Sequence, residues 1–503
     1  MSFGQVIYLL EDDCQQICQS ENKYGTYSAN AGLIIALAYY SGKFIMRELV
    51  SGFTKRGAEI HDGSSSVDHL SRSPKNMAYH QKERAVQQVQ VGQRTLASDA
   101  SVAIHRRDRM PEDSLTHSGR HFLQIPGPTN VPDRVLRAMH RAVIDHRSQE
   151  FSRLGSEVLE NLSPVFQTQG PVIIYPSSGT GAWEAAIVNT LSAGDRVLMF
   201  ETGHFSQLWR QLVERFGVVV DYVPGNWRRG ASVAELASRL DSDHNHTYKA
   251  VMVVHNETSS GVTTSIADLR QQMNRSNHPA LLMVDTISSL GSIDYRHDEW
   301  GVDVTVAGSQ KGLMLPPGLS FNAISGKALA AGKSAKLPRS YWDWQEMLGF
   351  NKNGFFPFTP ATTLLYGLQE ALKMLHEEGL PNVFRRHQRH GEATRTAVRA
   401  WGLEIVCEDP REYSSALTAV FMPEGHDADR LRSIILENFD MSLGAGLSKF
   451  AGKVFRIGHL GSFSDLMLAG TLSGVEMGLR LAGVPHQAGG VTAALQSLAP
   501  TGH

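Results

Sequence analysis

The sequence predicts an α/β protein, with a mostly parallel sheet in a large domain and a smaller α+β domain at the C-terminus. After residue 120, short apolar runs rich in β-branched residues alternate with stretches that have helical spacing. Strands buried on both faces of a parallel sheet have such continuous apolar runs, and their alternation with helices indicates βαβ units. A chain of 503 residues is also long enough to form two or three domains.

The expected elements follow from these runs in chain order. Strands of the large sheet are predicted at 172–175, 197–200, 218–220, 251–254, 281–284 and 302–307. Helices are expected between them, for example at 182–191 and 205–216. A further helix is predicted at 364–375, where leucines fall on one face at helical steps. Strands near 416–421 and 454–457, with helices between and after them, predict the smaller domain.

The predicted domain organisation has four parts. Residues 119–362 form the large domain with an N-terminal arm, 363–485 the small domain, and 486–503 a tail. Residues 1–118 have no sustained periodicity and many polar and charged side chains, which is typical of a disordered extension. The alternative is that translation starts at Met110 and that the preceding residues do not belong to the natural protein.

Composition excludes several classes of partner. The net charge of −2, from 48 basic and 50 acidic side chains, does not favour binding to nucleic acid or to an anionic membrane. No apolar run approaches the roughly 20 residues of a membrane span. The three cysteines, Cys14, Cys18 and Cys407, predict neither a disulfide framework nor a metal cluster. We therefore expect a cytoplasmic protein without a metal site.

Two motifs that follow predicted strands are suited to a phosphate and a heterocyclic ring. The stretch Ser177-Ser178-Gly179-Thr180-Gly181-Ala182 opens a helix, so that its N–H groups and hydroxyls suit an anion. An ordinary glycine-rich turn is the alternative. Asp285 ends the apolar run 281–284, and a buried carboxylate there needs a partner such as a protonated ring nitrogen. A helix N-cap or a structural ion pair would explain Asp285 equally well.

Two further motifs supply an amine and a guanidinium. Lys311, in Gly308-Ser309-Gln310-Lys311-Gly312, follows the run 302–307, and partial burial makes a lysine amine nucleophilic towards an aldehyde. Arg456 lies inside the apolar strand 454–457, and its fork matches a carboxylate. A solvated loop lysine and an internal salt bridge are the alternatives. Together, the four motifs predict a pyridoxal-phosphate enzyme in which Lys311 carries the cofactor as a Schiff base.

The order of these motifs resembles that of the class V aminotransferases, which are pyridoxal-phosphate enzymes of fold-type I. The resemblance covers about residues 119–485 and is greatest to the serine–glyoxylate branch, which is related to the alanine–glyoxylate aminotransferases. Other matching stretches are Pro126-Gly127-Pro128-Thr129-Asn130, Trp183-Glu184, His255-Asn256-Glu257-Thr258, Asp298-Glu299-Trp300-Gly301-Val302-Asp303, Phe358-Thr359-Pro360 and Gly452-Lys453-Val454-Phe455-Arg456-Ile457-Gly458.

The resemblance implies a role for each matching residue. Lys311 would be the catalytic lysine, Asp285 would pair with the ring nitrogen, and Arg456 would bind the substrate carboxylate. Thr258 would bond the 3-oxygen of the ring and Phe205 would stack on it. Ser178, Gly179, Thr180 and Gln310 would hold the phosphate. The family also implies a homodimer with shared active sites, in which Thr359 reaches the partner's phosphate and Arg147 the partner's substrate.

The implied activity is transfer of an amino group from L-serine or alanine to glyoxylate by a ping-pong mechanism. The products would be hydroxypyruvate or pyruvate, and glycine. Two other functions remain open. A cysteine desulfurase of the same fold needs a mobile nucleophilic cysteine, whereas Cys407 lies in an apolar run typical of a buried thiol. A non-catalytic scaffold that only binds the cofactor is the third possibility.

Overall fold

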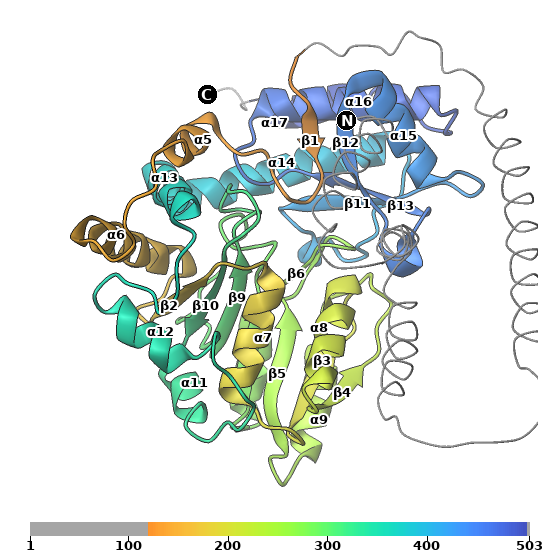
Figure 1. The fold of residues 1–503 in the computed structure, drawn as a ribbon. Helices are drawn as coiled ribbons and strands as arrows, with labels where there is room; N and C mark the ends of the chain where they lie inside the picture. Colours follow the sequence, from red (N-terminus) through yellow and green to blue (C-terminus); the bar gives the residue numbers. More distant parts are fainter. Residues whose placement is uncertain (1–118, 500–503) are drawn as a thin grey trace, which may run out of the picture. The chain divides into compact units, whose positions relative to one another are not determined.

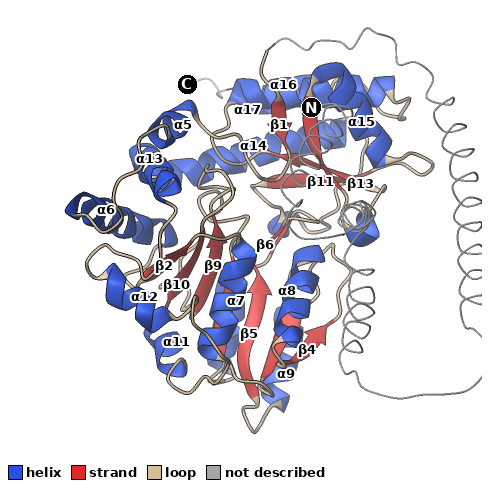
Figure 2. Cartoon of the chain, viewed as in Figure 1, coloured by secondary structure: helices blue, strands red, loops and turns tan. Residues whose placement is uncertain are grey.

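The computed structural model describes residues 119–499, and Figure 1 shows their arrangement. The described strands gather in two separate groups (Figure 2) and form a sheet of seven strands, a sheet of four and a two-stranded ribbon. None of the described helices is both long and apolar enough to cross a bilayer. The predictions for residues 1–118, including Cys14, Cys18 and the alternative start at Met110, lie outside the described residues.

The large sheet contains the strands that the sequence predicts. Its strands are β2 (Val172–Tyr175), β3 (Arg196–Phe200), β4 (Val219–Val223), β5 (Tyr248–Val254), β8 (Leu281–Asp285), β9 (Val304–Gly308) and β10 (Ser320–Ile324). They lie in the order β2-β10-β9-β8-β5-β3-β4. Only β10 runs antiparallel to its neighbours, β2 and β9. The mostly parallel sheet is confirmed, and each predicted apolar run overlaps one strand.

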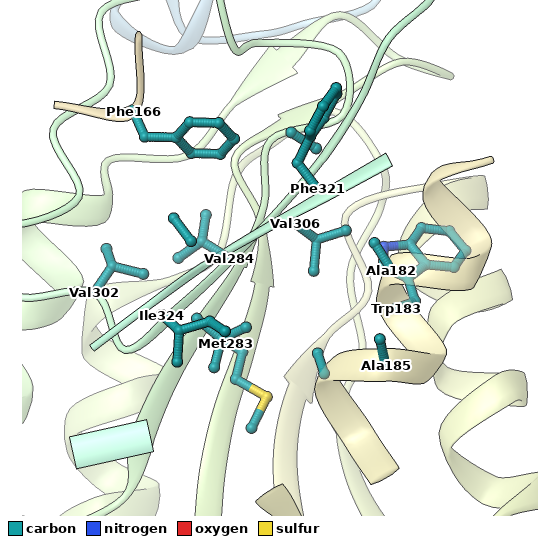
Figure 3. Close-up of a cluster of buried hydrophobic side chains, with 14 of the residues drawn as sticks. Phe166, Ala182, Trp183, Ala185, Met283, Val284, Val302, Val306, Phe321 and Ile324 are labelled. Atoms are coloured by element: carbon teal, nitrogen blue, oxygen red, sulfur yellow. The ribbon is translucent and has the colours of Figure 1, made fainter. Parts of the chain in front are cut away.

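Helices accompany this sheet and share one hydrophobic core with it. They are α5 (Asp133–Met139), α6 (Gln149–Phe166), α7 (Gly179–Thr190), α8 (His204–Arg215), α9 (Val233–Ser242), α10 (Ile266–Arg275), α11 (Gly326–Ala331), α12 (Trp344–Asn351) and α13 (Thr362–Glu378). In Figure 1, α7 and α8 cross the same face of the sheet. Figure 3 shows Ala182 and Trp183 of α7 beside Val306 of β9, all buried. This packing removes apolar surface from water and so fixes α7 on the sheet.

The smaller sheet has its own core. Its strands are β1 (Phe122–Gln124), β11 (Leu417–Phe421), β12 (Met441–Ala445) and β13 (Val454–Gly458), in the order β1-β12-β13-β11. Its helices are α14 (Leu380–Ala400), α15 (Ala428–Phe439), α16 (Asp465–Leu481) and α17 (Gly490–Leu498), and the ribbon is β6 (Asn256–Glu257) with β7 (Val262–Thr263). Short 3₁₀ turns occur at Pro410–Glu412 and Ser448–Phe450.

The two cores bear on the predicted domain boundaries. The buried leucines of α13 pack in the core of the large sheet. The stretch predicted as a tail contains α17, whose Ala494 and Leu498 are buried in the core of the smaller sheet. Strand β1 comes from the start of the described chain but pairs with β12 of the smaller sheet. The division at residues 362 and 485 stays a prediction.

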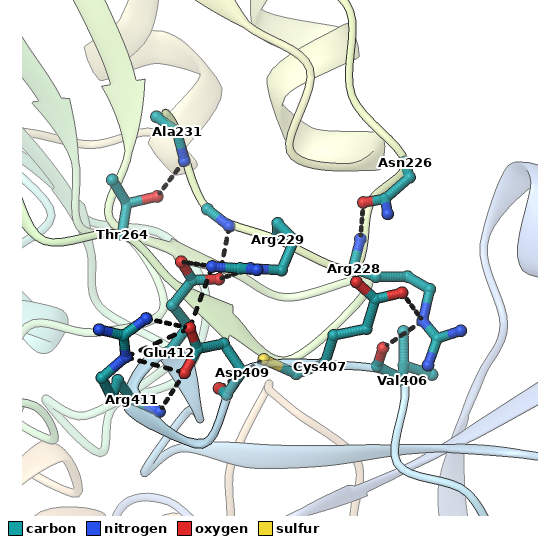
Figure 4. Close-up of polar contacts among 12 residues, drawn as sticks. Asn226, Arg228, Arg229, Ala231, Thr264, Val406, Cys407, Asp409, Arg411 and Glu412 are labelled. Carbon is teal, nitrogen blue, oxygen red and sulfur yellow. Dashed lines mark hydrogen bonds and ion pairs between the residues drawn. The ribbon is translucent and has the colours of Figure 1, made fainter. Parts of the chain in front are cut away.

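Arginine side chains connect the segment after β4 to the segment before β11 (Figure 4). Arg228 donates from Nε to the carbonyl of Val406 at 2.8 Å. Arg229 pairs with Asp409 and Glu412, both at 3.0 Å. Exposed ion pairs contribute little stability individually, so this network chiefly sets how the two segments meet.

Candidate active site

Asp285 and Lys311 lie at the same edge of the large sheet. Asp285 is the last residue of β8, and Lys311 follows the end of β9 by three residues. The two strands are parallel, with Asp285 opposite Val306. The carboxyl ends of parallel strands meet at one edge of a sheet, which is where ligands bind in open α/β folds. Both side chains are buried, at 4% and 8% exposure.

The carboxylate of Asp285 is held by two donors. The indole Nε1 of Trp183 donates to Oδ2 at 3.0 Å, and the backbone N–H of Ile287 donates to Oδ1 at 2.6 Å. Burial, with a smaller contribution from the nearby charge of Glu257, raises the pKa of Asp285 to about 7. A carboxylate accepts at about four positions, so Asp285 can still accept a hydrogen bond from a protonated ring nitrogen.

The amine of Lys311 contacts the N-terminal arm of the described chain. Its Nζ donates to the carbonyl of Pro126 at 2.5 Å. A Cβ at Gly127 would lie 2.5 Å from Nζ, so any residue larger than glycine would clash with the lysine in this arrangement. Burial, together with the charge of Arg456, lowers the pKa of Lys311 to about 7, whereas Asp285 acts in the opposite direction. Near neutral pH a large fraction of the amine is therefore unprotonated and nucleophilic.

The predicted phosphate-binding residues surround the N-terminus of α7. Ser178 is the N-cap of this helix, but its side chain makes no capping hydrogen bond, and Ser178 and Thr180 are exposed. Gly179 is needed because a Cβ there would lie 2.3 Å from Ile287 Cδ1. The amide oxygen of Gln310 is buried and has no partner among the described residues. A Cβ at Gly308 would lie 3.2 Å from Gln310 Oε1 and 3.8 Å from Gly179 N, so both groups border the same space.

This cradle suits an anion. Free N–H groups and the positive end of the helix dipole favour negative charge at the start of α7. The unpartnered amide of Gln310 can turn its NH₂ group to the same place. The exposed hydroxyls of Ser178 and Thr180 add two donors. The residues present therefore fit the phosphate, the ring nitrogen and the aldehyde of pyridoxal phosphate.

Arg456 lies on β13 with its guanidinium directed by backbone carbonyls. Its Nε donates to Ala445 O at 2.7 Å and its Nη1 to Thr258 O at 2.8 Å. It is 7% exposed, and burial lowers its pKa to about 10. In the part of the chain that the structure describes, no carboxylate forms an ion pair with it. The internal salt bridge considered from the sequence is thus absent from the described residues.

Thr258 lies beside this guanidinium, and Phe205 contacts Glu257, the residue before Thr258. Phe205 is in the first turn of α8 and is partly exposed. Thr258 is buried and directly follows β6. The hydroxyl of Thr258 has no hydrogen-bond partner among the described residues.

Arg147 and Thr359 are placed elsewhere on this chain. Both are exposed and line one pocket of about 570 Å³ together with His146 and Phe350. None of the residues that follow β8 and β9 lines this pocket. The structure thus brings Arg147 and Thr359 together with each other but not with Lys311 of the same chain.

Three contacts at this site were not assigned from the sequence. They are the Trp183 indole on Asp285, the Pro126 carbonyl on Lys311 and the buried Glu257 carboxylate beside Phe205. All three residues lie in stretches that resemble the family. The spacing of residues along the sequence does not indicate which side chains and backbone groups form hydrogen bonds in the fold.

Comparisons with known proteins agree with this geometry. The family model "Aminotransferase class-V" matches residues 121–476. The chain is 47% identical to a serine–glyoxylate aminotransferase of Methylorubrum extorquens, over 75% of this chain and 96% of that protein. It is 45% identical to an L-aspartate–glyoxylate aminotransferase of Paracoccus denitrificans, over 74% and 94%. The crystal structure of ureidoglycine–glyoxylate aminotransferase from Bacillus subtilis has a TM-score of 0.70 and 25% identity, covering 76% of this chain and 99% of that one.

The catalytic edge of the sheet, the fit to the cofactor and these relatives lead to one conclusion. The chain belongs to the class-V aminotransferase family and is a pyridoxal-phosphate-dependent aminotransferase of fold-type I.

Proposed function

We propose that this aminotransferase transfers the amino group of L-serine, or of alanine, to glyoxylate by a ping-pong mechanism. The products are hydroxypyruvate or pyruvate, and glycine. The observation that carries the proposal is the buried, unpaired guanidinium of Arg456, whose charge acts on Lys311. Its remaining N–H groups, one on Nη1 and two on Nη2, match the α-carboxylate that amino acids and 2-oxo acids share. The names of the serine–glyoxylate and aspartate–glyoxylate relatives support glyoxylate as the acceptor.

We assign the cofactor contacts by position. Pyridoxal phosphate, when bound, supplies a ring that withdraws electrons from the α-carbon of the amino acid. Asp285 holds the proton of the ring nitrogen, because its buried carboxylate has two neutral donors and can still accept from a charged one. Phe205 stacks on the ring and Thr258 bonds its 3-oxygen. The phosphate is held by Ser178, Gly179, Thr180 and Gln310.

Lys311 performs the proton transfer in this proposal. With substrate and cofactor bound, its free Nζ would accept the proton from the amino acid's α-carbon. A base whose pKa lies near 7 can both accept and return a proton at neutral pH. The Pro126 carbonyl holds Nζ on the side of the N-terminal arm, which limits the directions from which the amine can act. Arg456 fixes the carboxylate and so orients the Cα–H bond.

The pocket with Arg147 and Thr359 supports a homodimer with shared active sites. In the same region Tyr341 and Phe350 are each 44% exposed, and Tyr341 stacks on Phe358 at 4.2 Å. Exposed aromatic side chains of this kind are typical of interfaces. In the dimer, Thr359 contacts the partner's phosphate and Arg147 the partner's substrate. We also place the protein in the cytoplasm, as its composition suggests.

Cys407 argues against the desulfurase alternative. The thiol is 2% exposed, and its Sγ donates to the carbonyl of Asp409 (Figure 4). Burial raises the pKa of Cys407 to about 12, so that the reactive thiolate is scarce at neutral pH. A desulfurase needs a mobile, nucleophilic cysteine, and this thiol is neither.

A panel of amino donors tests the proposal. Purified protein with pyridoxal phosphate is given glyoxylate and, one at a time, L-serine, L-alanine, L-asparagine, L-aspartate or L-cysteine, and the products are identified. We expect glycine to form, fastest with serine or alanine. Glycine formed fastest from aspartate would correct the donor alone. Release of sulfide from cysteine at a comparable rate would favour the desulfurase, and no product from any donor would favour a non-catalytic scaffold.

A further inference from the structure

Glu257 is a fully buried carboxylate with no assigned role. It lies on β6, directly before Thr258, and is 0% exposed. In the part of the chain that the structure describes, no lysine, arginine or histidine lies within ion-pair distance of it. A buried carboxylate is costly unless its oxygens receive hydrogen bonds, so its retention needs a physical reason.

Four donors surround this carboxylate. Oε1 accepts from Ser259 N at 3.1 Å, from Ser259 Oγ at 2.7 Å and from Phe205 N at 3.3 Å. Oε2 accepts from Ser206 N at 3.2 Å. All four contacts are donated to Glu257, which is the pattern of an ionised carboxylate. Although burial raises the pKa of Glu257, these donors oppose that effect.

The four donors belong to two segments that face the active site. Phe205 and Ser206 form the first turn of α8, and their N–H groups would otherwise be unpaired at the helix N-terminus. Ser259 follows Thr258, whose carbonyl receives the guanidinium of Arg456. Strand β6 packs against α8 (Figure 1). Glu257 therefore joins the segment of Phe205 to the segment that holds Arg456.

Two further observations show that the surroundings are built for this side chain. A Cβ at Gly203 would lie 2.3 Å from Glu257 Cγ and 2.4 Å from Ser259 Oγ, so only glycine leaves room for the carboxylate. Glu257 also interacts electrostatically with Arg456, whose charged form it stabilises.

We propose that Glu257 is a positioning residue of this aminotransferase. Its carboxylate holds the first turn of α8 and the segment 258–259 together, and thereby places Phe205 on the cofactor ring and Arg456 on the substrate carboxylate. The inference rests on the proposed function, because that function assigns the contacts of Phe205 and Arg456. Glu257 itself touches neither the ring nor the substrate in this proposal.

The variant Glu257→Gln tests the role with little change in shape. In a glutamine, an NH₂ group replaces one of the two oxygens and cannot accept a hydrogen bond. It must face either Ser206 N or the pair Phe205 N and Ser259 N, so the four hydrogen bonds cannot all be kept. The matched control is Glu476→Gln. Glu476 is also a carboxylate that accepts from the start of a helix, from Val491 N at 3.0 Å and from Gly489 N at 3.0 Å. It belongs to α16, which packs in the core of the smaller sheet. Apo-protein is titrated with pyridoxal phosphate, and Kd is read from absorbance.

We expect Kd for pyridoxal phosphate and KM for L-serine to rise about tenfold in E257Q. E476Q should lower Tm while leaving both constants within about twofold of the wild type, because residues that act independently do not couple. In the background Phe205→Leu, E257Q should raise Kd by less than it does in the wild type, since the two residues act through one contact.

The outcomes separate this inference from the proposed function. A Kd and a KM in E257Q equal to those of an active wild type would overturn the positioning role and leave the function standing. A wild type that binds the cofactor but forms no glycine would instead overturn the proposed function. If E257Q does not fold, Ser259→Ala replaces it, because it removes one donor from the carboxylate. An unchanged Kd in that variant would equally overturn the role.

Discussion

Asp285 ends strand β8 and Lys311 follows the adjacent parallel strand β9, and each changes the pKa of the other. Asp285 raises the pKa of Lys311, although burial lowers that pKa overall, and Lys311 lowers the pKa of Asp285. An amine and an acid at the ends of two adjacent strands can act on the two ends of one small aromatic ring. The other residues of the site then hold the phosphate of the cofactor and the carboxylate of the substrate.

Asp285→Asn tests the acid. The amide keeps the shape and can still accept from Trp183, but it carries no charge to hold the proton of the ring nitrogen. We expect kcat to fall by about 100-fold or more, on the scale of losing one preorganised electrostatic partner, while the cofactor still binds. Steady-state kinetics and absorbance measure the two quantities. The control is Asp294→Asn, at a side chain 40% exposed, which should change neither. A kcat close to that of the wild type in D285N would remove the assignment.

Arg456→Lys tests the carboxylate clamp. A lysine keeps the positive charge but cannot form two parallel hydrogen bonds to a carboxylate. KM for L-serine and for glyoxylate should rise about tenfold or more, with the cofactor's Kd unchanged. Arg432→Lys is the matched control, because Arg432 also donates from Nε to a carbonyl of β12, that of Leu443 at 2.8 Å. Equal KM values in R456K and R432K would contradict the clamp.

Gly127→Ala tests the contact between the N-terminal arm and Lys311. The added methyl would lie 2.3 to 2.7 Å from the lysine side chain, at a φ of +92°. We expect the loss of the absorbance band of the bound cofactor. Gly119→Ala isolates the cause, because Gly119 has a φ of +105° and nothing within 4 Å of the added methyl. Retention of the band in G127A would show that the arm does not restrict Lys311.

Buried histidines predict a stability that falls with acid. Burial lowers the pKa of His387 to about 3, whereas an unfolded histidine titrates near about 6.5. Below that value the unfolded chain binds a proton that the folded protein does not. The contribution of His387 to the free energy of unfolding is therefore at its full value above pH 6.5. It decreases towards pH 3, by up to about 1.4 kcal/mol per pH unit.

Urea unfolding at pH 7.5 and pH 5.5 measures this loss. His387→Gln should lose less stability between the two values than the wild type, because glutamine does not titrate. His387 donates from Nδ1 to Val383 O and accepts at Nε2 from Gly461 N, which is the neutral tautomer. An identical loss in H387Q would show that other groups cause the acid dependence.

The sequence predicted the parallel sheet because its strands are continuous apolar runs, as in 281–284 before Asp285. It did not predict β10, in which Ser320 and Asn322 interrupt the apolar pattern. β1 and β12 were also missed, since β1 has three residues and β12 contains Ser442 and Gly444. Each of these strands pairs with a strand distant in the sequence, β10 with β2 and β1 with β12, which local periodicity does not encode.

The candidate site could be predicted where a motif follows a strand. Asp285 and Lys311 were proposed in this way, because strand ends in an open sheet are adjacent in space. Arg456 was proposed because an arginine inside an apolar strand needs a partner. The contacts of Trp183 and Glu257 could not be predicted, since they depend on which face of a helix packs on the sheet. The separation of Arg147 and Thr359 from Lys311 within one chain likewise requires three-dimensional packing.

The most direct test of the account is to reduce the holoenzyme with borohydride, digest it and locate the cofactor by mass spectrometry. Reduction converts the bond between lysine and cofactor into a stable amine, so that the labelled residue can be identified. The account predicts the label on Lys311 alone. A label on another lysine, or no labelled peptide from protein that is yellow before reduction, would contradict it.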